Sequence, residues 1–121
     1  ARKTTIPVAT GERFINIQEF QDLLMRQGAR YVRPDVCALG GLTPCKKVAA
    51  LAESHYVDIV PHNPLGPVST AACLQLVAAV PNVCIQEFPS FYEKGDEKKM
   101  IKTPFEIERG YITIPTYSLE S

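Results

Sequence analysis

Four ionisable side chains stand at equivalent places in this chain, each directly after a short apolar run. They are Glu12, Asp35, His62 and Glu87. In parallel α/β folds, ligands bind at the carboxyl ends of the strands, which meet at one edge of the sheet. Because neighbouring strands lie about 4.8 Å apart, we expect these four side chains to line one rim in the order acid, acid, base, acid.

This set of residue types suits the removal of a proton from carbon. His62 is a competent general base near neutral pH, and Asp35 on the neighbouring strand could orient its ring and stabilise the imidazolium. Glu12 offers the hard oxygen ligand that Mg²⁺ prefers, and such a metal would stabilise an enolate dianion. Glu87, if burial keeps it protonated, could donate a hydrogen bond to a substrate carboxylate.

Each of the four residues taken singly also has an ordinary structural explanation. Glu12 could be a solvated loop residue, and Asp35 after a proline could simply form a turn. His62 could be a loop histidine bonded to backbone, and Glu87 a surface charge at a strand end. Their shared position at four strand ends favours a common site over four separate explanations.

Four strands and three helices are predicted to alternate along the chain. The strands are the apolar and β-branched runs at residues 6–10, 31–33, 57–60 and 83–85. Short connections are typical of right-handed parallel crossovers, and few polar residues interrupt these runs, as in strands buried on both faces. The repeat of about 25 residues is close to that of a (β/α)8 barrel. The predicted fold class is therefore α/β.

Capping signals place the helices. Asn16 and Glu19 have the spacing of a capping box, and Gly28 is placed to end the first helix. Thr43 is the expected cap of the second helix. We expect the helices at residues 16–27, from 44 onward and at 69–80, then a polar segment at 90–100 and a final strand at 111–114.

The composition is that of an ordinary globular domain. Hydrophobic residues make up 45% of the 121 residues, and 13 basic residues balance 13 acidic ones. This neutral balance gives no electrostatic reason to expect nucleic acid or an anionic membrane as a partner. The longest apolar run, near residues 71–80, is too short for a transmembrane helix, and no secretory signal is expected from the first residues.

The cysteines indicate a reducing compartment. Cys37, Cys45, Cys73 and Cys84 have no CxxC spacing. We interpret them as small buried hydrophobic residues of a cytoplasmic protein, and neither as zinc ligands nor as disulfides.

Five short segments carry a family resemblance. They are ATGER at 9–13, RPD at 33–35, GGLT at 40–43, PHNPLGP at 61–67 and QE at 86–87. In this order and spacing they resemble the mandelate racemase branch of the enolase superfamily, and most closely its galactonate dehydratase-like enzymes. The PHNPLGP segment favours the dehydratase type over the racemase. The resemblance covers nearly the whole chain.

The resemblance implies a fold and a role for each site residue. Residues 1–121 would form the C-terminal half of a (β/α)8 barrel, with strands five to eight, their crossover helices and a C-terminal extension. Glu12 would be the third of three metal-binding carboxylates, and Asp35 and His62 a catalytic dyad. Glu87 would contact the substrate carboxylate as the enediolate forms. The residues implied to bind substrate are His62, Asn63, Pro64 and Glu87.

The implied reaction is that of an acid-sugar dehydratase. A proton α to a carboxylate is removed, Mg²⁺ stabilises the intermediate, and loss of the β-hydroxyl gives a 2-keto-3-deoxy acid. Family members are much longer, and this chain lacks their capping domain, first barrel strands and other metal carboxylates. We therefore expect the chain alone to be inactive, and to form a homo-oligomer or associate with the missing half of a barrel.

Three other functions stay open. A half barrel could serve as a non-catalytic structural or interaction module, and racemase chemistry belongs to the same superfamily. A free-standing flavodoxin-like domain that binds an anion is the third, although the sequence has no glycine-rich phosphate loop.

Overall fold

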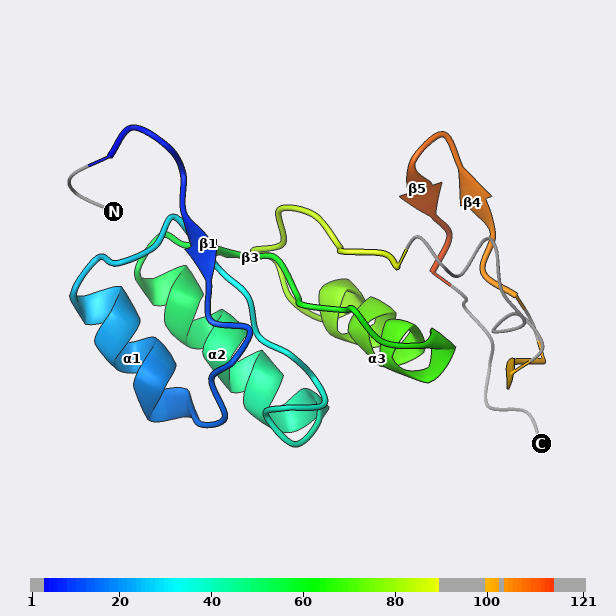
Figure 1. The fold of residues 1–121 in the computed structure, drawn as a ribbon, viewed down its shortest axis with the longest axis horizontal. Helices are drawn as coiled ribbons and strands as arrows, with labels where there is room; N and C mark the ends of the chain where they lie inside the picture. Colours follow the sequence, from blue (N-terminus) through cyan, green and yellow to red (C-terminus); the bar gives the residue numbers. More distant parts are fainter. Residues whose placement is uncertain (1–3, 90–99, 103, 115–121) are drawn as a thin grey trace.

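Three short parallel strands organise the chain (Figure 1). In the computed structural model, which describes residues 4–89, 100–102 and 104–114, the strands are β1 (Ala9–Thr10), β2 (Tyr31–Val32) and β3 (Asp58–Ile59). They lie in the order β1-β2-β3, and their register places Thr10 beside Val32 and Val32 beside Ile59. This order confirms the predicted parallel crossovers, although each strand is shorter than expected.

The predicted fourth strand is present as a single parallel bridge. Val83 pairs with Ile59 on the side of β3 away from β2. The Ile59 N–H donates to the carbonyl of Asn82 at 2.8 Å, and the Cys84 N–H donates to the carbonyl of Ile59 at 3.0 Å. The strand order expected for half a barrel is therefore seen, but the barrel is not closed.

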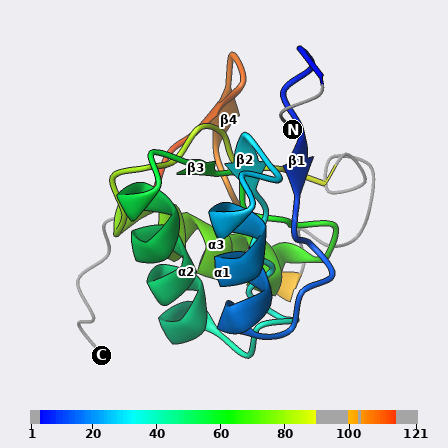
Figure 2. The ribbon, with the colours of Figure 1, turned by 90° about the vertical axis from the view of Figure 1, so that its left-hand side faces the viewer.

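Three helices lie together on one side of the strands (Figures 1 and 2). They are α1 (Ile17–Met25), α2 (Leu42–Ser54) and α3 (Pro67–Ala78). Helix α2 lies between the other two and contacts both. No helix within the described ranges is both long enough and apolar enough to cross a membrane.

The core lies between the helices and the strands. Phe20 of α1, Val48 of α2 and Leu76 of α3 pack around Val32 and Ile59, which come from the two inner strands. All five side chains are almost completely buried. Removing this apolar surface from water is the main favourable contribution to folding, and it holds the helices against one face of the sheet.

Helix α1 begins as predicted but ends differently. The Asn16 side chain accepts a bond from the Glu19 N–H at 3.0 Å, and the Glu19 carboxylate accepts one from the Asn16 N–H at 3.3 Å, which confirms the capping box. The left-handed residue at the end is Gln27 (φ 50°), not Gly28. A Cβ at Gly28 would lie 2.6 Å from Leu23 Cδ1, so a larger residue there would require that side chain to shift.

Helices α2 and α3 each begin two residues earlier than predicted. Gly41, not Thr43, caps α2, and Gly66 rather than Ser69 stands before α3. Neither glycine offers a side-chain hydrogen bond. Pro67 occupies the first turn of α3, where its fixed φ suits a helix and its missing N–H costs nothing.

A β-hairpin follows at the C-terminal side of the chain. Strand β5 (Tyr111–Ile112) confirms the first half of the strand predicted at 111–114, and it pairs antiparallel with β4 (Ile107–Glu108), which was not predicted. Positive φ angles at Arg109 and Gly110 give the tight turn that suits the twist of a hairpin. Most of the polar segment expected at 90–100 lies outside the described residues.

The cysteine prediction is half right. All four thiols are free, and Cys45 and Cys73 are buried among the core residues. Cys37 and Cys84 are exposed, so the prediction that they are buried is wrong. Cys37 lies in the turn after β2, and Cys84 lies at the outer side of the bridge beside β3, where no described strand covers it.

Candidate active site

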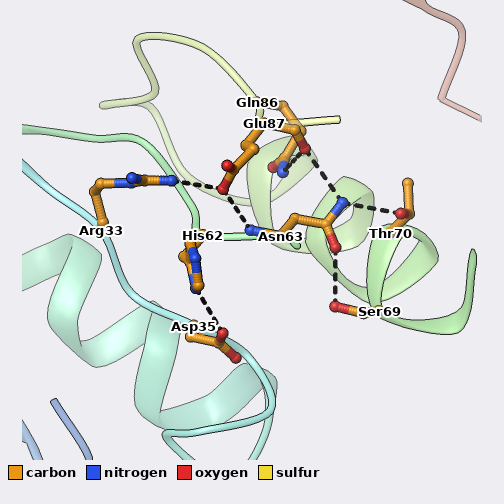
Figure 3. Close-up of polar contacts among 8 residues, drawn as sticks. All are labelled: Arg33, Asp35, His62, Asn63, Ser69, Thr70, Gln86 and Glu87. Atoms are coloured by element: carbon orange, nitrogen blue, oxygen red, sulfur yellow. Dashed lines mark hydrogen bonds and ion pairs between the residues drawn. The ribbon is translucent and has the colours of Figure 1, made fainter. Parts of the chain in front are cut away.

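Asp35 and His62 meet at the carboxyl ends of β2 and β3. Their backbones form a parallel bridge, in which the His62 N–H donates to the carbonyl of Pro34 at 3.0 Å. The Nδ1 atom of His62 lies 2.8 Å from Oδ2 of Asp35 (Figure 3). The two side chains predicted to form a dyad are therefore in direct hydrogen-bond contact.

Asp35 is fixed by its own turn. Its Oδ1 atom accepts hydrogen bonds from the backbone N–H groups of Cys37 at 2.7 Å and Ala38 at 3.0 Å. Both carboxylate oxygens are thus occupied, and the side chain is nearly buried. Asp35 in turn orients the imidazole, because a carboxylate at Nδ1 favours the proton on that nitrogen and leaves the lone pair of Nε2 available as a base.

Glu87 accepts hydrogen bonds and forms an ion pair. Its Oε2 atom lies 2.5 Å from Nη2 of Arg33 and accepts a bond from the Asn63 N–H at 2.8 Å (Figure 3). The prediction that Glu87 donates a hydrogen bond depended on burial, but its side chain is 36% exposed and both of these neighbours are donors. Here Glu87 is an acceptor.

Asn63 connects this rim to the start of α3. Its Nδ2 donates to Oγ1 of Thr70 at 2.9 Å and to the carbonyl of Glu87 at 3.2 Å, and its Oδ1 accepts from Oγ of Ser69 at 3.0 Å. The side chain is fully buried. Contact between Asn63 and substrate stays a prediction, but in this structure its polar groups bind protein. Pro64, the next residue, is exposed.

Glu12 stands apart from the other three. It follows β1, whose pairing with β2 puts it at the same end of the sheet as Asp35. Gly11 turns the chain just before it with φ 116°, and a Cβ at Gly11 would lie 2.6 Å from the ring of Phe20. Within the part of the chain that the structure describes, the Glu12 side chain has no hydrogen bond or ion pair.

The described residues do not make a magnesium site by themselves. No group of three histidine, cysteine or acidic side chains within residues 4–89, 100–102 and 104–114 is placed to hold a metal ion. One half-buried carboxylate is too few for Mg²⁺, which is bound through several oxygen ligands. Glu12 can therefore be one ligand at most.

Sequence reasoning missed Arg33, Ser69 and Thr70. Arg33 stands two residues before Asp35, and the two-residue period of a strand puts both side chains on the same face. That spacing was the available signal for Arg33. For Ser69 and Thr70 the sequence pattern predicts only the beginning of a helix.

The family of the chain follows from comparison with known sequences. The family described as Enolase C-terminal domain-like matches residues 1–118. The chain belongs to this family. D-galactonate dehydratase from Variovorax paradoxus is 40% identical over 117 residues, which are 93% of this chain and 31% of that protein. D-galactonate dehydratase from Xanthomonas oryzae is 44% identical over 87 residues, 72% of this chain and 23% of that protein.

Solved structures of enolase superfamily members share the fold. An enolase from Pantoea ananatis with bound D-gluconate and Mg has a TM-score of 0.83 and 28% identity, covering 94% of this chain and 28% of that one. A mandelate racemase/muconate lactonizing enzyme from Jannaschia sp. CCS1 has a TM-score of 0.82 and 31% identity, covering 95% and 29%. This enolase-type chain spans about 31% of the length of the Variovorax relative.

Proposed function

We propose that this chain provides the base-bearing part of a Mg²⁺-dependent acid-sugar dehydratase that acts on a galactonate-like substrate. The observation that carries the proposal is the 2.8 Å contact between His62 Nδ1 and Asp35 Oδ2 at the carboxyl ends of two parallel strands. Relatives that are 40% and 38% identical are D-galactonate dehydratases. The alternative of a flavodoxin-like domain is not retained, because the chain belongs to the enolase family.

The proposed chemistry needs only two residues of this chain for proton transfer. The Nε2 atom of His62 takes the proton α to the substrate carboxylate, and Asp35 stabilises the imidazolium that results. The electron pair of the broken C–H bond forms the double bond of an enediolate. The enediolate electrons then form the double bond between the α and β carbons as the β-hydroxyl leaves as water, taking up one proton that balances the proton received by His62. The enol tautomerises to a 2-keto-3-deoxy acid. Mg²⁺, for which Glu12 would be one ligand, would stabilise the enediolate charge when bound.

A second candidate is a non-catalytic half-barrel module. Strand β1 has a described partner only on the side of β2, so its other edge is open for pairing with a second copy or with another part of a barrel. In either role we propose a reducing, cytoplasmic environment, consistent with four free thiols.

A chimera tests the proposed function. The matching region of the Variovorax paradoxus D-galactonate dehydratase is replaced by this chain, and formation of the 2-keto-3-deoxy acid from D-galactonate is measured with Mg²⁺. We expect product from the chimera and none from its His62→Asn variant. A folded chimera without activity would favour the module. Conversion of D-galactonate to an epimer would indicate racemase chemistry instead.

A further inference from the structure

Arg33 reaches across the end of β3 to Glu87. It follows β2, whereas Glu87 follows the bridge on the other side of β3. The backbone N–H of Arg33 donates to the carbonyl of Thr10 at 2.9 Å, so the start of the side chain is anchored to β1 and β2. Its guanidinium ends 2.5 Å from Oε2 of Glu87 (Figure 3). The ion pair thus spans the rim above β3.

The rim is rich in negative charge for a site that would take an anion. Glu12, Asp35 and Glu87 all follow strands that end at this edge. Asp35 is paired with His62, and Glu87 with Arg33. A sugar acid carries a carboxylate, and like charges that are brought together without compensation repel each other. The ion pair with Arg33 offsets the charge of Glu87 where such a substrate would approach.

We propose that Arg33 is a positioning residue that neutralises Glu87, so that a sugar-acid anion can enter the rim. Both described bonds fall on Oε2, and Oε1 accepts none from the described residues. Arg33 and the Asn63 N–H thus hold Oε2 and leave Oε1 as the oxygen that a substrate can meet. This inference rests on the proposed function.

The first measurement uses the 121-residue chain itself. Urea unfolding of wild type, Arg33→Met, Glu87→Gln and the double variant gives the coupling between the two side chains. We expect Glu87→Gln to change the free energy of unfolding more favourably in the Arg33→Met background than in wild type. In that background the substitution removes a carboxylate that has lost its cation. Strictly additive effects would overturn the inference.

The second measurement uses the chimera and separates KM from kcat. We expect Arg33→Met to raise the KM for D-galactonate about tenfold, since an uncompensated carboxylate then repels the anion. Adding Glu87→Gln should bring KM back to the value of Glu87→Gln alone, and Arg33→Lys should keep KM near that of wild type. A purely structural Arg33 would not be rescued by removal of the second charge.

The outcomes separate the two proposals. Absence of turnover in the unsubstituted chimera contradicts the proposed function, and this inference falls with it. Turnover with a KM that Arg33→Met leaves unchanged, or that the double variant does not restore, overturns this inference alone. Thermal melting of each variant is the control that shows whether a raised KM comes from unfolding.

Discussion

At the scale of single residues, the Asp35–His62 contact determines which ring nitrogen can act as a base. Because Asp35 accepts at Nδ1, neutral His62 should carry its proton there and expose Nε2. We predict that ¹⁵N NMR of the chain shows this tautomer for His62. His55, the other of two histidines, is exposed and should show the mixture typical of a free ring.

Asp35→Asn is the matching variant for this measurement. The amide can still bond to the turn after β2 but no longer provides an anionic acceptor, so the tautomer preference of His62 should weaken while His55 is unchanged. An unchanged tautomer ratio in Asp35→Asn would contradict the orienting role of Asp35.

The two buried thiols make stability depend on alkaline pH. Burial raises the pKa of Cys45 and of Cys73 from the ordinary value of 9.0 to about 12. Below pH 9 both thiols are protonated in the folded and unfolded chain, so their contribution is fully present. As pH rises from 9 to 12, only the unfolded thiols ionise, and the contribution is lost.

We therefore predict that the free energy of unfolding falls more steeply over this pH range in wild type than in the Cys45→Ala/Cys73→Ala variant. Urea unfolding at several pH values measures both slopes, and the Cys37→Ala/Cys84→Ala variant is the control because both of its thiols are exposed. Equal slopes for wild type and the buried-thiol variant would show that these thiols ionise equally in both states.

At the scale of elements, Asn63 joins the loop after β3 to the first turn of α3. It bonds to Ser69 and Thr70 of the helix and to the carbonyl of Glu87 on the adjacent segment. Asn63→Ala removes all three of these bonds, although Thr70 keeps its bond to the Gly66 carbonyl and the Glu87 carbonyl keeps its bond from Gln86. We predict a loss of about 2 kcal/mol in the free energy of unfolding. Thr43→Ala on the exposed surface of α2 is the control and should have little effect.

Urea unfolding of the two variants decides this prediction. Equal stability of Asn63→Ala and Thr43→Ala would mean that the network around Asn63 does not hold α3 in place. Loss of stability confined to Asn63→Ala would support a positioning role for Asn63, as opposed to the predicted contact with substrate.

Local signals in the sequence were sufficient for much of the fold. The capping box of Asn16 and Glu19 involves neighbours in sequence, and its two bonds are formed as predicted. The parallel order of the strands followed from short apolar runs with short connections. The predicted first residues of α2 and α3 were wrong because the residues before these helices are Gly41 and Gly66. Glycine makes no side-chain hydrogen bond to the first turn, so no polar capping residue marks these positions in the sequence.

Contacts in the candidate site could be predicted from the sequence only where a residue's position along its strand determines its neighbour. Asp35 and His62 meet because both stand at the ends of adjacent parallel strands. The ion pair of Arg33 joins residues 54 apart in sequence, and no local pattern specifies such a partner. The same holds for Asn63, whose burial depends on how α3 packs against the rim.

At the scale of the whole molecule, the open sheet edges determine whether the chain should assemble with a partner. Among the described residues, strand β1 is paired only with β2, and the bridge at Val83 is the last pairing at the other side. Ile85, beside that bridge, is 63% exposed. We predict that the chain elutes in size-exclusion chromatography as an assembly larger than its 13.4 kDa monomer. A stable monomer would show that neither edge recruits a partner.

His62 is proposed to remove the α-proton of a sugar acid. This role is tested by the rate at which the chimera, dissolved in D₂O with Mg²⁺ and D-galactonate, breaks the C–H bond α to the carboxylate, followed by NMR. We predict that His62→Asn lowers this rate by about 10²–10⁴-fold, with melting temperature unchanged. A His62→Asn chimera that breaks the bond as fast as the unsubstituted chimera would contradict it.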